Sequence, residues 1–108
     1  MPDPSPLTII AIATAATGQE TMLRAAQEKL VAETVKEPGC LRYELHQSLD
    51  DRRVLIFVES WESERAWKAH MQGAAIKRFQ ASGAGHLIQD FALHRMALVA
   101  DGGLSRTQ

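Results

Sequence analysis

Hydrophobic and polar residues change their spacing several times along the chain, and each change predicts an element. The apolar run from Leu7 to Thr14 predicts a buried strand, because it is continuous and too short to span a bilayer. The segment 17–20 reads T-G-Q-E, the Ser/Thr-x-x-Glu spacing of a capping box, so a helix is expected to begin there. Pro38 and Gly39 end that helix. Its apolar face repeats at helical spacing through Met22, Leu23, Ala26, Leu30 and Thr34.

Two alternating stretches follow, and they predict a β-hairpin that turns at 49–52. The first runs from Cys40 to Ser48 and the second from Arg53 to Trp61. A short hairpin that pairs an even-numbered with an odd-numbered position places one mixed set of side chains on a shared face. That set is Arg42, Glu44, His46, Phe57, Glu59 and Trp61. The opposite face is then almost purely aliphatic, and we expect it to lie under the helices.

The remaining pattern completes an α+β fold. Ser63 to Met71 predicts a second helix, Gly73 interrupts it, and the segment 75–79 adds a short helical continuation before a last strand at 90–99. The order strand, helix, strand, strand, helix, strand matches the ferredoxin-like βαββαβ plan with one antiparallel sheet. We therefore expect one domain at 7–100, an N-terminal extension at 1–6 and a flexible tail at 101–108.

In this plan both helices lie on one side of the sheet, so the other side needs a cover. The expected uncovered face carries Leu55, Phe57 and Trp61, together with either Leu7 and Ile9 or Ile10 and Ile12. An apolar patch of that size is unfavourable in water. A second copy that packs sheet to sheet is the simplest cover, so we expect a homodimer.

Composition narrows the classes of function. The 108 residues carry a net charge of −1 without a basic stripe, which argues against nucleic acid as a partner. Cys40 is the single cysteine, so neither an internal disulfide nor a thiolate zinc site is expected. The first six residues contain an aspartate and no Lys or Arg, unlike a secretory signal. We expect a cytoplasmic protein that binds no membrane.

Three ionisable residues are the candidates for catalysis. His46 near a carboxylate is suited to act as a general base, although a histidine that fills polar space at an interface is an equal alternative. Glu59 is a candidate acid or base, and its alternative is a cross-strand pair with Arg42. His70 shares a helix face with Trp67, and its alternative is a core histidine with a satisfied hydrogen bond. No third ligand stands at a recognisable spacing from the two histidines, so no metal site is predicted.

The expected substrate-binding residues are aromatic. Trp61, Phe57 and Tyr43 are candidates to hold a flat ring, and Trp67 is a further one. The chain has no G-x-S-x-G, P-loop or G-x-G-x-x-G motif, so hydrolase and nucleotide-binding functions lack their usual supports. Cys40 has no Cys-His spacing around it and is not a predicted nucleophile.

The stretch E-P-G-C-L-R-Y-E-L-H-Q, followed by V-E-S-W-E-S and A-W-K-A-H-M, resembles the antibiotic biosynthesis monooxygenase domain family. The resemblance extends from Leu7 to about Val99. It implies a ferredoxin-like monomer, a dimeric α+β barrel, and oxygenation of phenolic or quinol-like substrates by O2 without metal, flavin or haem. Relatives also include haem-degrading enzymes, isomerases of small phosphorylated sugars and proteins without a known activity.

Two departures from the family pattern matter. Gly73-Ala74-Ala75 replaces a second Pro-His pair, and the chain contains no asparagine, which both the polyketide-oxidising and the haem-degrading relatives use near the oxygen chemistry. No histidine lies between Ile76 and Gly85, where a haem ligand is expected. The particular machinery of those relatives is therefore not carried over.

The resulting hypothesis is an enzyme without a cofactor that oxidises a small hydroquinone or polyphenol with O2. In it, His46, or Glu59 through water, removes a phenolic proton, and His70 polarises an oxygen substituent. The first alternative is a non-catalytic small-molecule-binding or stress-response dimer of the same fold. The second is an isomerase, for which Arg42, Lys68 and Lys77 are candidate phosphate anchors.

Overall fold

The computed structural model describes residues 6–102. Its elements are β1 (Leu7–Ala15), α1 (Glu20–Thr34), β2 (Cys40–Gln47), β3 (Val54–Trp61), α2 (Glu64–Met71), α3 (Ala74–Ala81), a 3₁₀ turn η1 (Ala84–Leu87) and β4 (Ile88–Met96). The strands form one antiparallel sheet in the order β2-β3-β1-β4. This confirms the ferredoxin-like α+β prediction. Most of the expected extension at 1–6 and tail at 101–108 lies outside the described residues.

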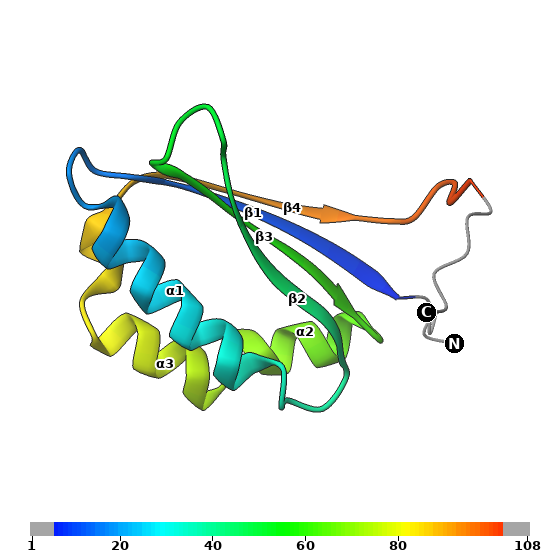
Figure 1. Ribbon diagram of the computed structural model, residues 1–108. Helices are drawn as coiled ribbons and strands as arrows, with labels where there is room; N and C mark the ends of the chain where they lie inside the picture. Colours follow the sequence, from blue (N-terminus) through cyan, green and yellow to red (C-terminus); the bar gives the residue numbers. More distant parts are fainter. Residues whose placement is uncertain (1–5, 103–108) are drawn as a thin grey trace.

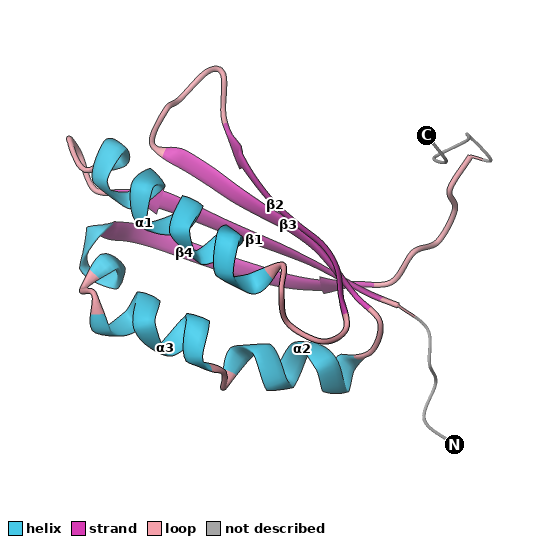
Figure 2. Ribbon diagram, turned by 60° about the horizontal axis from the view of Figure 1, so that its bottom comes forward, coloured by secondary structure: helices cyan, strands magenta, loops and turns pink. Residues whose placement is uncertain are grey.

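The helices form a single layer on one side of the sheet, and the other side is bare (Figure 1). Figure 2 shows this layer from its own side, with α1 along the sheet and α2 and α3 following one another beside it. Gly73 lies at the break between α2 and α3, as predicted, and its N–H donates to the carbonyl of His70 at 3.0 Å. Ser63 begins α2 by accepting a hydrogen bond from the N–H of Ala66.

The start of α1 differs from the prediction. The helix begins at Glu20, and its N-cap residue is Gln19, which makes no side-chain capping bond. The N–H of Gln19 donates to the carbonyl of Ala16, and Gly18 has a φ of +82°, so a tight turn occupies the expected capping box. The buried face of the helix is also rotated from the expected one, since Met22 is exposed. The observed buried face consists of Leu23, Gln27, Leu30 and Thr34.

The predicted hairpin faces are wrong, because the register differs by one residue. Tyr43 lies opposite Glu59 and His46 lies opposite Ile56, so odd-numbered positions pair with odd-numbered ones. The loop between the strands comprises residues 48–53, so it includes Ser48 and Arg53 in addition to the four residues of the expected turn. Ser48 favours this longer loop, since its N–H donates to the carbonyl of Val54 and its hydroxyl accepts from two loop amides. A shift of the register by one residue moves a whole set of side chains to the other face.

The two faces of the sheet therefore exchange part of their predicted contents. The face under the helices carries the buried residues Ile9, Ala11, Tyr43, Leu55, Phe57, Glu59 and Trp61. The bare face carries Ile10, Ile12, Val54, Ile56 and Val58, with Arg42, Glu44 and His46 along the β2 edge. Ile10 and Ile12 are one of the two predicted alternatives. Leu55, Phe57 and Trp61, which we expected on the bare face, belong to the core.

Candidate functional site

The candidate site lies under the helices, at the end of β3. Trp61 is fully buried, and its Nε1–H donates a hydrogen bond to Oε1 of Glu59 at 2.9 Å. The two side chains share a face because successive side chains of a strand alternate. A buried indole and a buried carboxyl group therefore form the floor of this region.

Glu59 is the buried ionisable group of this floor. Its exposed fraction is 4%, and burial raises the pKa of its carboxyl group to about 7, while the hydrogen bond from Trp61 acts in the opposite direction. A carboxyl group with that pKa exchanges protons near neutral pH. Glu59 is therefore suited to general acid or base chemistry.

His70 lies above the indole, in the last turn of α2. Its ring centroid is 4.7 Å from that of Trp61 and 5.3 Å from that of Tyr43. Its Nδ1 is 2.7 Å from Oε1 of Glu37, and the imidazole is 1% exposed. Burial lowers the pKa of His70, and the hydrogen bond and negative charge of Glu37 oppose that change. Nδ1 of His70 therefore has a hydrogen-bond partner, as the alternative of a core histidine predicted.

Tyr43 completes the aromatic wall. Its ring lies 5.1 Å from Phe57 and 6.2 Å from Trp61, measured between centroids. Burial raises the pKa of the Tyr43 phenol well above its usual range, the charge of Glu59 adds to this, and the nearby Thr34 hydroxyl opposes it. The Thr34 hydroxyl is buried and makes no hydrogen bond of normal geometry with the described residues. Tyr43 is therefore neutral at physiological pH.

The loop between α1 and β2 brings Glu37 to His70. Gly39 in this loop has a φ of +82°, and a Cβ added there would lie 2.6 Å from the Cβ of Ala66 in α2. The carbonyl of Gly39 accepts a hydrogen bond from the N–H of Glu62 at 2.8 Å. Only glycine allows this backbone to approach α2 so closely. The loop and the helix are thus held together next to the Glu37–His70 contact.

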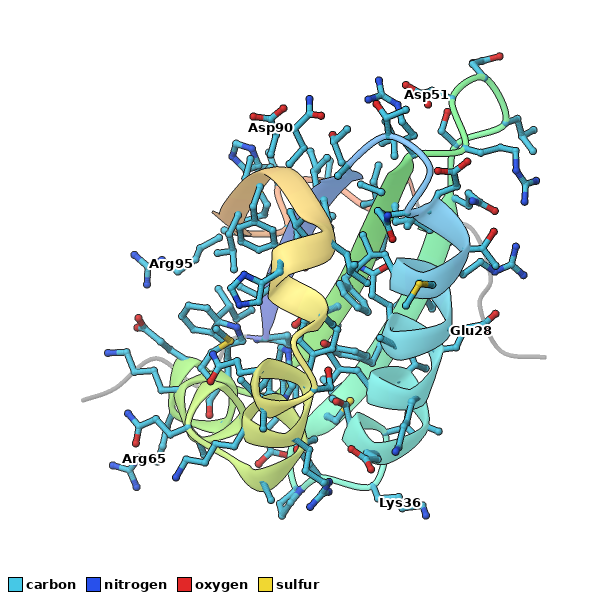
Figure 3. All side chains as sticks on the ribbon, turned by 90° about the vertical axis from the view of Figure 1, so that its left-hand side faces the viewer. Glu28, Lys36, Asp51, Arg65, Asp90 and Arg95 are labelled. Atoms are coloured by element: carbon cyan, nitrogen blue, oxygen red, sulfur yellow. The ribbon has the colours of Figure 1, made fainter. Side chains whose placement is uncertain are left out.

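An open groove of about 620 Å³ lies between this loop and the α2–α3 segment. Glu37 and His70 are part of its lining, whereas Glu59 and Trp61 are not. Lys36 and Arg65 also line it, and Figure 3 shows both at the same end of the molecule. Of the buried residues of the site, His70 is therefore the one that borders this groove.

The structure brings together most of the predicted site residues. Tyr43, Phe57, Trp61 and Trp67 belong to or pack against one core cluster, and Trp67 has a buried indole N–H without a hydrogen-bond partner in the described residues. Glu59 and His70 contact the same cluster through Trp61.

His46 is the predicted catalytic residue that the structure separates from the others. It lies on the bare face, where its Nε2 contacts Oε1 of Glu44 at 2.9 Å. Arg42 pairs with Glu44 on that face, so the suggested Arg42–Glu59 pair is wrong. Of the proposed phosphate anchors, Lys68 pairs with Glu64 on α2, away from the Arg42 edge.

Glu37 is the residue that the sequence analysis missed as a site candidate. It stands in a loop, 33 positions before its partner His70, and no periodic pattern connects the two. The usable signal was the order Glu-Pro-Gly after a helix, because such a loop turns back toward the sheet.

The described residues contain no group of three or more His, Cys, Asp or Glu side chains that could hold a metal ion. Within 6–102, no helix is long and apolar enough to cross a membrane.

Comparison with protein families and solved structures gives consistent results. The family model for antibiotic biosynthesis monooxygenase matches residues 6–82. Comparison with curated proteins finds no match.

Three solved structures illustrate the structural similarity. A Pseudomonas aeruginosa protein is 33% identical, with a TM-score of 0.83 over 89% of this chain and 96% of its own. A Mycobacterium tuberculosis protein is 25% identical, with a TM-score of 0.82 over 92% of this chain and all of its own (100%). A Chloroflexus aurantiacus protein, provisionally named an antibiotic biosynthesis monooxygenase, is 25% identical, with a TM-score of 0.77 over 94% and 100%. The resemblance that the sequence motifs indicated is confirmed.

Proposed function

Because the chain belongs to the antibiotic biosynthesis monooxygenase family, we propose that it oxidises a small hydroquinone or polyphenol with O2, without a metal or organic cofactor. The observation that carries this proposal is the buried cluster in which Trp61 contacts both Glu59 and His70. It combines two ionisable groups with a flat apolar wall, an arrangement that suits a phenolic substrate.

In the proposed reaction the substrate ring enters the groove and reaches His70. His70, which lines the groove, removes a phenolic proton, or Glu59 does so through water, and the electron-rich anion then reduces O2. One oxygen atom forms a bond to the ring in place of a hydrogen, and the other leaves as water. A hydroquinone thereby becomes a hydroxyquinone, and its own electrons complete the reduction of O2, so no further reductant is needed. The protein contributes orientation, exclusion of water and proton transfer.

The bare face of the sheet supports the proposal of a homodimer. Ile10, Ile12, Ile56 and Val58 form an apolar strip, and the charged triplet Arg42, Glu44 and His46 borders it. A second copy that packs on this strip would remove it from water. Sedimentation of the wild type and of Ile56→Lys tests this proposal. The wild type should sediment as a dimer and the variant as a monomer, and a monomeric wild type would contradict it.

A second candidate function is a small-molecule-binding dimer without catalysis. It is favoured by the packing of the core, since Trp61 is fully buried and neither it nor Glu59 lines the groove. In that case a ligand would occupy the groove against His70, and no turnover would follow.

Oxygen uptake by purified, metal-stripped protein with a panel of hydroquinones separates the two functions. An enzyme should exceed the uncatalysed autoxidation rate for at least one substrate. Glu59→Gln or His70→Ala should then reduce kcat, by about a hundredfold or more for the residue that acts as general base. His46→Ala serves as the comparison and should reduce it much less, because His46 lies on the other face. If every rate equals autoxidation while binding is measurable by calorimetry, the binding function holds instead.

A further inference from the structure

The contact between Glu37 and His70 is closer and less exposed than the contact between Glu44 and His46. Its atoms are 2.7 Å apart, and the side chains are 21% and 1% exposed. An ionised carboxylate only accepts hydrogen bonds, so Nδ1 of His70 must carry the proton of this bond. In a neutral imidazole that leaves Nε2 unprotonated. Nε2 makes no hydrogen bond to the described residues.

The position of Glu37 is set by two elements of the fold. The close approach of Gly39 to Ala66 fixes the loop against α2. On the other side, a Cβ added to Gly73 would lie 3.7 Å from Oε2 of Glu37, which places the carboxylate beside the amino end of α3. That helix end has no side-chain cap, and its dipole favours a negative charge. One carboxylate oxygen thus contacts His70 while the other lies near the helix end.

We propose that Glu37 is the positioning residue of this site, and that its bond to Nδ1 holds His70 in the tautomer whose Nε2 accepts the substrate proton. That a phenol donates this proton rests on the proposed function. The assignment of the tautomer does not depend on it. The proton passes from the phenolic oxygen to Nε2, the imidazole becomes a cation, and Glu37 remains ionised beside it. The carboxylate stabilises this cation inside the protein.

Other titratable groups lie near this histidine or line the groove beside it, and their charges also contribute to a pH profile of His70. They are Lys36 in the loop, Tyr43 on β2, Glu59 behind Trp61 on β3, Glu62 before α2, Arg65 in α2, and Glu33 with its partner Arg78.

The first test needs no substrate. In ¹⁵N-histidine NMR spectra of the wild-type protein, Nδ1 of His70 should show the signature of a protonated nitrogen and Nε2 that of an unprotonated one. Glu37→Leu should remove this preference and lower the pH of half-titration of His70, because the charge that opposes the effect of burial is gone. Glu37→Asp should restore it in part. Glu62→Gln changes a carboxylate that lines the same groove and should leave Nδ1 of His70 protonated and Nε2 unprotonated, as in the wild type.

A wild-type spectrum with a protonated Nε2 would overturn the inference. So would a folded Glu37→Leu variant that keeps the wild-type tautomer and titration. The wild-type spectrum decides the matter even where a variant fails to fold.

The second test applies if a substrate is found. Glu37→Leu should lower kcat about tenfold or more with little change in KM, and should shift the acid limb of the kcat profile to lower pH. A substrate that is turned over equally by wild type and Glu37→Leu would overturn the role of Glu37 while leaving the proposed function intact. Conversely, the NMR result stands if no phenol is oxidised.

Discussion

Within residues 6–102 the protein contains two histidine–glutamate pairs that are nearly alike in distance and very different in surroundings. Nε2 of His46 lies 2.9 Å from Glu44 on the bare face, and Nδ1 of His70 lies 2.7 Å from Glu37 under the helices. The His46 and Glu44 side chains are 57% and 44% exposed, whereas His70 is 1% exposed. Water and salt screen the first pair but have little access to the second.

The neighbours of each pair show what this difference means. Arg42 is the main cause, with His46 second, of a lowered pKa of about 2 for the Glu44 carboxyl group. Such a triplet along an edge strand is a solvated charge cluster. The neighbours of His70 are two aromatic rings, and one of them bonds to a carboxyl group whose pKa is raised to about 7. The length of a contact therefore does not distinguish the two pairs, whereas their surroundings do, since the His70 imidazole is buried against aromatic rings.

The largest effect on stability is expected at Trp61, whose ring packs against His70 of the buried Glu37–His70 pair. Trp61→Ala should lower the free energy of unfolding by about 3–5 kcal/mol, because the indole is fully buried. Trp61→Phe is the matched control. It removes the bond to Glu59 but keeps most of the apolar contact, so about 1–2 kcal/mol is expected. Urea unfolding measures both, and equal losses for the two variants would contradict the central packing role of the ring.

The next largest effect concerns pH. The folded pKa of Glu59 is about 7, against an ordinary value of 4.5, so between these pH values the folded state holds a proton that the unfolded state has lost. Stability from this group should therefore fall as pH rises from about 4.5 to about 7, by about 2–3 kcal/mol. Glu59→Gln should remove that part of the slope in urea unfolding across this range. An identical slope in the variant would show that Glu59 titrates normally.

The smallest effects compare the two histidines directly. His70→Ala should cost about 1–3 kcal/mol of unfolding free energy, because it leaves a partly buried carboxylate without its partner. His46→Ala should stay within about 0.5 kcal/mol at the same protein concentration. Added salt should remove the His46 effect and leave the His70 effect in place. Equal costs for the two substitutions would erase the distinction between the pairs.

The order of elements could be predicted from the sequence, because it depends on local signals. Pro38 and Gly39 end a helix, Gly73 interrupts another, and alternation distinguishes strands from helices over short windows. These signals do not depend on what the chain later contacts. The family motifs also indicated that β2, β3 and α2 follow one another as in the family fold. The predicted order of elements and the predicted family both agree with the findings.

The faces of the hairpin could not be predicted in the same way, because they depend on the number of loop residues. Arg53 belongs to the loop instead of the strand pairing, and this moved His46 away from Glu59. The hydrogen bonds of Ser48 that hold this loop are made between its own residues in the folded state. Alternation shows which side chains of one strand share a face. It does not show which side chains of the neighbouring strand lie on that same face, because this depends on the pairing register.

The site was predicted by residue type more successfully than by arrangement. Glu59, Trp61, Tyr43 and His70 were candidates, yet Glu59 and Tyr43 were assigned to opposite faces and lie opposite each other in the sheet. Glu37 was not a candidate, since its contact depends on how a loop packs against a helix much later in the chain.

The contact of Gly39 with Ala66 also has a consequence for protein engineering. Position 39 has no side chain and position 66 has only a methyl group, and a Cβ added at 39 would lie 2.6 Å from that methyl group, so enlarging position 39 would separate the loop from α2. Substitutions at 39 and 66 should therefore be selected together in a library rather than one at a time. To admit bulkier molecules, a designer can vary this pair of positions. Retention of the Glu37–His70 contact then shows whether the site has kept its arrangement.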